Sequence, residues 1–171
     1  MYLSSISIEL GTGILDHNNR KFIAENVDRE RTKNNEEFKN ISLEEAYHIL
    51  FDNALQSYND RQKRADRKID NYLEHIQKSK QEKPFYEIIV QVGNHNDMGI
   101  GSRNEPIAKA ILEDYMLSFE KQNPYLSVFN ATLHMDEATP HLHIDFIPFT
   151  TDSKRGLDTR VSMKQALDRK S

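Results

Sequence analysis

Three histidines lie within ten residues of one another, at His134, His141 and His143. Neutral imidazole is a common ligand of Mn, Zn, Ni and related ions, and a three-histidine site with open positions lets the metal polarise a substrate oxygen. One histidine alone would more simply be a half-buried sheet residue that is hydrogen-bonded to its neighbours. Because three occur together, with Asp136 and Glu137 between them, the spacing favours a metal site.

The two segments that carry these histidines have the alternation of β-strands. In residues 126–134, one face would hold Asn130, Thr132 and His134, and the other Phe129, Ala131 and Leu133. In residues 141–149, one face would hold His141, His143 and Asp145, and the other Leu142, Ile144 and Phe146. A hairpin that joins the two strands would place three imidazoles on one polar face of a sheet.

Further strands and helices must complete this sheet. Residues 2–10 and 85–92 are predicted strands, the first half-buried through its apolar face of Ile6, Ile8 and Leu10. Gly11, Gly13, Asn18, Asn19 and then the polar residues 28–40 are expected to form a long loop region. We expect an α+β domain, in which an antiparallel sheet has helices packed on one face and the histidines on the other.

Helix boundaries are indicated by capping residues. Ser42 followed by Glu45 is a capping box, and the lack of apolar residues over 59–64 predicts two helical pieces before residue 78. A third helix, capped by Asn104, should end before Asn123, and residues 162–170 are predicted to begin a helix that the chain end interrupts. We therefore expect residues 1–171 to be one domain, the N-terminal part of a longer protein.

Composition excludes several classes of protein. The absence of cysteine excludes disulfide frameworks, thiolate zinc sites and cysteine nucleophiles, and fits a reducing cytosol. No apolar stretch is long enough for a membrane segment, so a cytoplasmic protein is expected. A net charge of -4 argues against general nucleic-acid coating.

Positive charge is nevertheless concentrated in two stretches. Residues 60–83 contain eight basic and five acidic residues, and residues 152–171 contain six and three. The first stretch is interpreted mainly as a solvated helix face. In the second, Lys154, Arg155 and Arg160 follow the histidine strand and are candidate DNA contacts.

The segment from His134 to His143 closely resembles the His-x-Asp-Glu-x-x-Pro-His-x-His motif of the MobV/Pre family of plasmid mobilisation and recombination proteins. A second motif of the family, His-x-x-Arg, matches His17 and Arg20. It is followed in the family by an Asn-Ile/Val-Asp-x-x-Arg-Thr/Ser motif, which residues 26–32 (Asn-Val-Asp-Arg-Glu-Arg-Thr) match. The resemblance implies an HUH-type relaxase domain, a metal-dependent endonuclease that nicks one strand at a plasmid transfer origin and keeps the 5′ end covalently bound.

The resemblance also implies a role for each matching residue. His17 would be the nucleophile, Arg20 would contact a phosphate, and His134, His141 and His143 would hold a divalent metal. Mn²⁺ is preferred because it accepts both imidazole and phosphate oxygen, and Mg²⁺ or Zn²⁺ would also fit. Glu137 would orient the His17 ring or accept its proton. The expected partner is plasmid origin DNA, as a single strand or hairpin, and a C-terminal part beyond this chain would provide oligomerisation.

The sequence departs from the family at residues 33–36, where Lys-Asn-Asn-Glu replaces a common His-Leu-Asn-Tyr. DNA contacts by that His or Tyr are therefore not expected here. Two other functions remain open: a three-histidine hydrolytic nuclease or phosphoesterase without a covalent intermediate, and a non-catalytic module that binds the origin.

Overall fold

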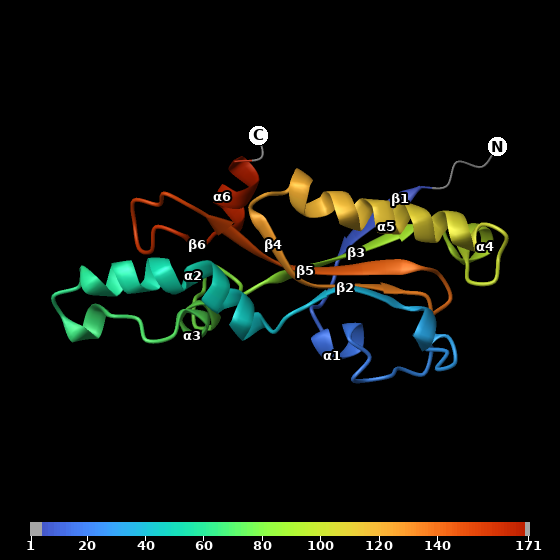
Figure 1. The fold of residues 1–171 in the computed structure, drawn as a ribbon, viewed down its shortest axis with the longest axis horizontal. Helices are drawn as coiled ribbons and strands as arrows, with labels where there is room; N and C mark the ends of the chain where they lie inside the picture. Colours follow the sequence, from blue (N-terminus) through green and yellow to red (C-terminus); the bar gives the residue numbers. More distant parts are fainter. Residues whose placement is uncertain (1–4, 170–171) are drawn as a thin grey trace.

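The computed structural model describes residues 5–169 as one antiparallel sheet with helices on both faces (Figure 1). The strand order is β1-β3-β5-β4-β2, and β6 pairs with the end of β5. The strands are β1 (Ile6–Leu10), β2 (Glu36–Asn40), β3 (Tyr86–Val92), β4 (Leu126–His134), β5 (His141–Thr150) and β6 (Arg160–Val161). No helix in the described part of the chain is long and apolar enough to cross a membrane.

One face of the sheet packs against helix α5 (Glu105–Gln122) and the short helix α4 (His95–Met98). Leu112 of α5 is fully buried against the apolar side chains of β3, β4 and β5. These include Leu142 and Ile144, whose neighbours His143 and Asp145 point to the opposite face, as the alternation predicts. The α+β class and the antiparallel sheet are thus confirmed.

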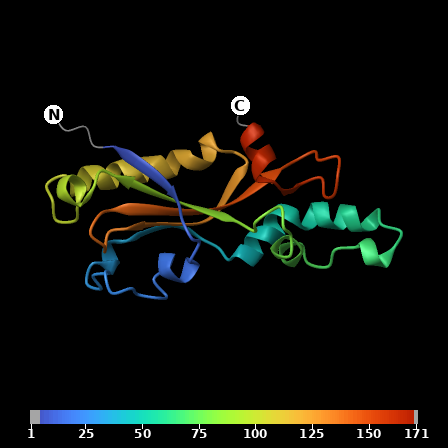
Figure 2. The same cartoon turned by 180° about the vertical axis from the view of Figure 1, so that it is seen from behind.

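A second apolar core lies on the histidine face, further along the sheet, where helices were not expected. Its helices are α2 (Leu43–Asp60), the 3-10 turn η2 (Ala65–Arg67) and α3 (Tyr72–Gln77), visible at one end of the molecule in Figure 2. A bulge in β4 after Val128 turns Phe129 toward this core instead of the α5 side predicted for it. Phe129 and Ile147 therefore give α2 and α3 an apolar surface on which to pack.

The capping and breaking signals act largely as predicted. The Ser42 side chain accepts a hydrogen bond from the Glu45 backbone N–H at the start of α2, and the helical segment breaks before η2. Ser162 caps α6 (Met163–Asp168) in the same way, but α6 ends at Asp168 instead of continuing to residue 170, which lies outside the described residues. Asn104 precedes α5 without capping it, because its side chain donates to the Asp97 carbonyl.

Both sheet edges differ from expectation. Ile6, Ile8 and Leu10 of β1 are 52–78% exposed, because β1 is an edge strand and α5 covers β3 and β4 instead. The region predicted as a long loop contains the short helix α1 (Leu15–Asn18), the turn η1 (Thr32–Asn34) and strand β2, which forms the other edge of the sheet. Polar strand β2 was missed because it lacks apolar alternation.

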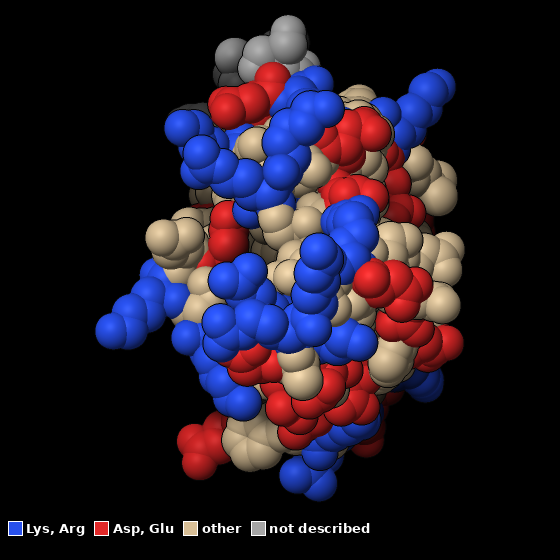
Figure 3. All heavy atoms as spheres, turned by 90° about the vertical axis from the view of Figure 1, so that its left-hand side faces the viewer, with Lys and Arg blue, Asp and Glu red and all other residues tan. Residues whose placement is uncertain are grey.

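Basic side chains gather at the end of the molecule where α2, η2 and the β5–β6 loop meet (Figure 3). A hollow of about 460 Å³ there is lined by both basic stretches, including Arg67 and Lys68 from the first and Arg155 and Arg160 from the second. A second hollow of similar volume is lined by residues between 150 and 169 only. The two stretches are therefore neighbours in the fold.

The second core should contribute most of the stability of α2. Replacing Phe51, which is 1% exposed, by alanine leaves a cavity and should cost about 3–5 kcal/mol of unfolding free energy. Ile49→Ala on the same helix is the matched control, because Ile49 is 69% exposed and should change stability by about 0.5 kcal/mol or less. Urea denaturation of both variants measures this difference, and equal losses would contradict the assignment of this core.

Candidate metal centre and nucleophile

The three sheet histidines meet as predicted. His134 lies directly opposite His141 in the β4–β5 register, and His143 pairs with Thr132. The ring centroids of His134 lie 5.2 Å from His141 and 4.6 Å from His143, and those of His141 and His143 are 5.0 Å apart. The His134 side chain is fully buried, and those of His143 and His141 are 6% and 13% exposed.

Hydrogen bonds define the tautomers of the two most buried rings. His134 Nε2 lies 2.8 Å from the Asn18 carbonyl oxygen, and His143 Nδ1 lies 2.6 Å from Glu87 Oε1. Because these oxygens only accept, the facing nitrogens carry the protons. The other nitrogens, His134 Nδ1 and His143 Nε2, are buried and have no hydrogen-bond partner within residues 5–169. Two lone pairs are thus available for a cation.

His141 follows the same pattern. Its Nδ1 lies 2.9 Å from the Thr139 carbonyl oxygen, so Nε2 presents a lone pair. Ligand atoms of His134, His141 and Glu137 lie within 4.8 Å of one another, and so do those of His134, His143 and His17. The two groups share His134, and neither contains His134, His141 and His143 together. Imidazole nitrogens together with a carboxylate oxygen are a donor set that suits a divalent metal such as Mn.

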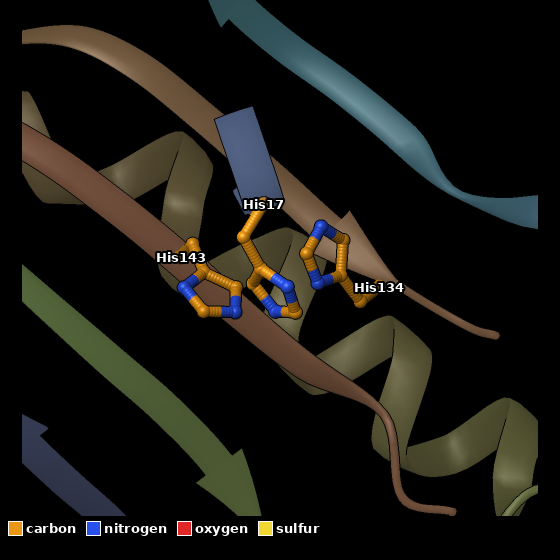
Figure 4. Close-up of side chains that lie close together, drawn as sticks. All are labelled: His17, His134 and His143. Carbon is orange, nitrogen blue, oxygen red and sulfur yellow. The ribbon is translucent and has the colours of Figure 1, made fainter. Parts of the chain in front are cut away.

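His17 joins this cluster from α1, far away in the sequence. Its ring centroid lies 5.8 Å from that of His134 and 5.9 Å from that of His143, and the three rings are side by side in Figure 4. Glu137 Oε1 lies 3.7 Å from His17 Nε2. The same oxygen is 3.8 Å from His134 Nδ1 and 3.7 Å from His141 Nε2, so Glu137 faces all three rings.

Burial keeps these imidazoles neutral. It lowers the pKa of His134 to about 2, with a further contribution from nearby His143. Burial also lowers the pKa of His141, followed by the effect of His143, and that of His17, followed by the charge of Arg20. Neutral rings are what both metal ligation and nucleophilic attack require.

Arg20 is held by two carboxylates of the β4–β5 turn. Its Nε donates to Asp136 Oδ2 at 2.9 Å, and its Nη2 donates to Asp136 and, at 2.8 Å, to Glu137 Oε1. Its side chain is only 7% exposed, and Nη1 lies 3.4 Å from His17 Nε2. Arg20 has a positive φ of 55°, which turns the chain back after α1. The guanidinium thus lies between His17 and the turn.

Asp136 is the centre of this arrangement, although the sequence assigned it no role. It is fully buried and also accepts hydrogen bonds from Thr32 Oγ1 at 2.9 Å and Asn35 Nδ2 at 2.7 Å. Burial alone would raise the pKa of Asp136, but the hydrogen bonds from Arg20, Asn35 and Thr32 lower it to about 2. Within the segment that departs from the family pattern, Asn35 therefore anchors the loop to the site.

Three further buried residues were given no role from the sequence, although Asp145 was placed on the histidine face. Asn18 connects α1 to the sheet, Glu87 bonds to His143, and Asp145 lies directly opposite Glu87 in the β3–β5 register. Burial and the charge of Glu87 raise the pKa of Asp145 to about 7. The available signal was a carboxylate inside the apolar run of residues 85–92, because buried carboxylates usually have partners.

The predicted DNA contacts Lys154, Arg155 and Arg160 do not lie beside the histidines. They lie at the other end of β5, whose ten residues span about 30 Å at about 3.3 Å per residue. Lys154 and Arg155 are exposed, whereas Arg160 donates to Ser153 Oγ at 2.9 Å. They instead belong to the basic end shown in Figure 3.

Comparisons with known proteins agree with this fold. The Mob_Pre family model, described as plasmid recombination enzyme, matches residues 17–170. The fold is similar to that of the MobM relaxase domain (MOBV; Mob_Pre), in a Mn-bound crystal structure with 22-nucleotide plasmid pMV158 oriT DNA at pH 5.5. The TM-score is 0.55 and the sequence identity is 18%, and the match covers 96% of this chain and 76% of that chain. The complex with 23-nucleotide DNA at pH 6.5 has a TM-score of 0.53 and 17% identity, with the same coverage. No curated protein sequence matches significantly.

Asp136→Asn should destabilise the protein, because it leaves the buried Arg20 charge without its main partner. We expect a loss of about 3–5 kcal/mol at pH 7. The pKa of Asp136 is lower in the folded than in the unfolded protein, so the carboxylate stabilises the fold above about pH 4. The deficit of the variant should shrink as the pH falls toward 2.

Denaturant titrations between pH 2 and pH 7 measure this deficit. The matched control is Asp66→Asn, which removes an exposed ion pair with Arg64 and should cost less than about 1 kcal/mol. An Asp136→Asn loss as small as that of the control would show that the Arg20–Asp136 contact does not hold the loop.

Proposed function

Because the chain belongs to the plasmid recombination enzyme family, we propose that it is a DNA relaxase that nicks one strand at a plasmid transfer origin. The strand would be joined at its 5′ end to His17. The observation that carries the proposal is the convergence of neutral His17 on two buried histidine nitrogens that lack hydrogen-bond partners among the described residues. The solved MobM complexes, which contain Mn and oriT DNA, support it.

The metal would be held by His134 through Nδ1 and by His141 and His143 through Nε2. These are the nitrogens that remain after each ring has donated its N–H to an oxygen. We propose Mn²⁺ first, since the similar structures are Mn-bound, with Mg²⁺ or Zn²⁺ as alternatives. When bound, the cation supplies positive charge that polarises a phosphate oxygen.

His17 would attack the scissile phosphorus through Nε2. Nη1 of Arg20 can only donate, so His17 Nε2, 3.4 Å away, carries the lone pair and the proton of the neutral ring lies on Nδ1. The lone pair would exchange this long contact with Arg20 for the phosphorus. A P–N bond forms and the P–O3′ bond breaks; the imidazole loses its Nδ1 proton and the 3′ oxygen gains one. The phosphoramidate retains much of the energy of the broken bond for later rejoining, which attack by water would not.

Glu137 and Arg20 would position the nucleophile. Glu137 Oε1 faces His17 Nε2 at 3.7 Å and is held by Arg20 at 2.8 Å, so this pair can orient the ring. Nε and Nη2 of Arg20 are bonded to carboxylates, and Nη1 donates to the His17 carbonyl at 3.2 Å and faces His17 Nε2 at 3.4 Å. Arg20 would therefore contact a phosphate only through Nη1, when His17 Nε2 leaves that contact to attack.

The basic end would bind a more distant part of the origin DNA. Arg155 and Arg160 line the same hollow there as Arg67 and Lys68, about 30 Å along β5 from the histidines. The proposed partner is origin DNA with a single strand at the histidines and a hairpin or duplex at the basic end. We propose that the reaction takes place in the cytoplasm, with plasmid DNA as the substrate.

His17→Ala should bind Mn²⁺ and origin DNA normally but form no covalent adduct, because the attacking nitrogen is lost. A denaturing gel with a labelled single-stranded origin oligonucleotide and Mn²⁺ measures the adduct. The wild-type adduct should decay in mild acid, as phosphoramidates do. His48→Ala, which removes an exposed histidine of α2, is the matched control and should retain full adduct formation.

Other results of this experiment would favour the alternatives. The double variant His141→Ala, His143→Ala should lose both Mn²⁺ binding and nicking. Full nicking by it in the presence of chelator would overturn the metal assignment. Efficient nicking without an adduct would favour a hydrolase, an acid-stable adduct on tyrosine would exclude His17, and origin binding without any nicking would favour a non-catalytic module.

Removing Lys154 and Arg155 together should weaken DNA binding and flatten its salt dependence. Each lost phosphate contact lowers the log–log slope by about one unit, so the slope should fall by up to about two. The matched control is Lys109→Ala with Lys121→Ala on α5, which changes the same net charge on the opposite face. An unchanged slope would identify the β5–β6 loop as solvated surface.

A further inference from the structure

Glu87 connects the metal ligands with the segment that carries His17. This carboxylate of β3 is 4% exposed and accepts three hydrogen bonds. Oε1 accepts from His143 Nδ1 at 2.6 Å and from Asn18 Nδ2 at 2.7 Å, and Oε2 accepts from the Gly13 backbone N–H at 2.6 Å. One carboxylate therefore holds both a sheet histidine and the two ends of the segment 13–18.

Asn18 completes the connection from the other side. It is 2% exposed, directly follows His17, and its backbone carbonyl accepts from His134 Nε2 at 2.8 Å. Its side chain donates to Asp145 Oδ2 at 3.1 Å as well as to Glu87. The residue next to His17 thus sets the tautomer of one sheet histidine and bonds to the residue that sets the tautomer of another.

We propose that Glu87 and Asn18 are positioning residues that couple cation binding at the sheet histidines to the placement of His17. The inference rests on the proposed function for the roles of these histidines. Coupling between two sites is reciprocal, so a cation at the histidines would order the segment 13–18, and an ordered segment would strengthen cation binding. A bound metal would thereby help to hold His17 in position for attack.

The chemistry of the contacts requires a carboxylate at position 87. Its three partners are all donors, whereas an amide has one oxygen and would direct its NH₂ group at one of them. If that NH₂ faced His143 Nδ1, the proton of the ring would move to Nε2 and remove the metal-binding lone pair. The loop also passes very close to this carboxylate, since a Cβ added at Gly11 would lie 2.1 Å from Glu87 Oε2.

The test compares wild type with Glu87→Gln, without DNA. We expect the Mn²⁺ affinity to fall about 10–100-fold, as found when partners of metal-bound histidines are lost. Long-range ¹H–¹⁵N spectra of the metal-free proteins should show His143 protonated on Nδ1 in wild type but not in the variant. Glu9→Gln, an exposed carboxylate on neighbouring β1, should change neither quantity.

Asn18→Ala tests the His17 side of the coupling separately from the metal-ligand side. It also provides a test of the coupling if Glu87→Gln does not fold. It leaves the Glu87–His143 contact, so Mn²⁺ should still bind. Mn²⁺ should slow amide hydrogen exchange over residues 13–18 in wild type but much less in Asn18→Ala, whose adduct formation should fall at least about tenfold.

Two outcomes would overturn the coupling. One is a folded Glu87→Gln protein with unchanged Mn²⁺ affinity and His143 tautomer, and the other is Mn²⁺-dependent protection of residues 13–18 that Asn18→Ala leaves intact. If wild type shows the affinity, tautomer and protection but forms no adduct, the coupling stands and the relaxase proposal fails.

Discussion

Each sheet histidine donates one N–H to an oxygen that can only accept, and the rest of the site depends on this constraint. The acceptors are the Asn18 carbonyl, the Thr139 carbonyl and the Glu87 carboxylate. They orient the rings and leave one lone pair of each for a cation, while burial lowers the pKa of His134 and of His141. Two of the acceptors also determine where α1 lies, so the same bonds that select the tautomers place His17.

The sheet can bury this polar cluster because its two faces have different cores. Beneath α5, the alternate residues of β5 are apolar, while their neighbours form the histidine face. On that face the polar site occupies one part of the sheet, and the core under α2 and α3 occupies the other. The bulge in β4 makes this division possible, since it turns Phe129 toward α2 just before the polar residues Asn130 and Thr132 begin.

Acidic and basic side chains also lie in different parts of the molecule. Negative side chains close to the histidines are held in a buried set in which Asp136 and Glu137 share Arg20. The exposed positive charge lies at the far end, where residues of the stretches 60–83 and 152–171 meet. A net charge of -4 is therefore compatible with a local surface suited to phosphate.

The sequence by itself determined the metal-ligand pattern. Side chains alternate between the two faces in residues 126–134 and 141–149, and the turn between these strands is short, so the three histidines can be arranged in few ways. It also determined the capped start of α2 and the break after it, which are local effects of backbone hydrogen bonding. Only the tertiary structure decided that β1 is an exposed edge, that polar β2 is a strand, and that Asn18, Glu87 and Asp136 join the site. Those outcomes depend on contacts between residues about 70 to 115 positions apart, and no local pattern encodes which distant donor will meet a buried carboxylate.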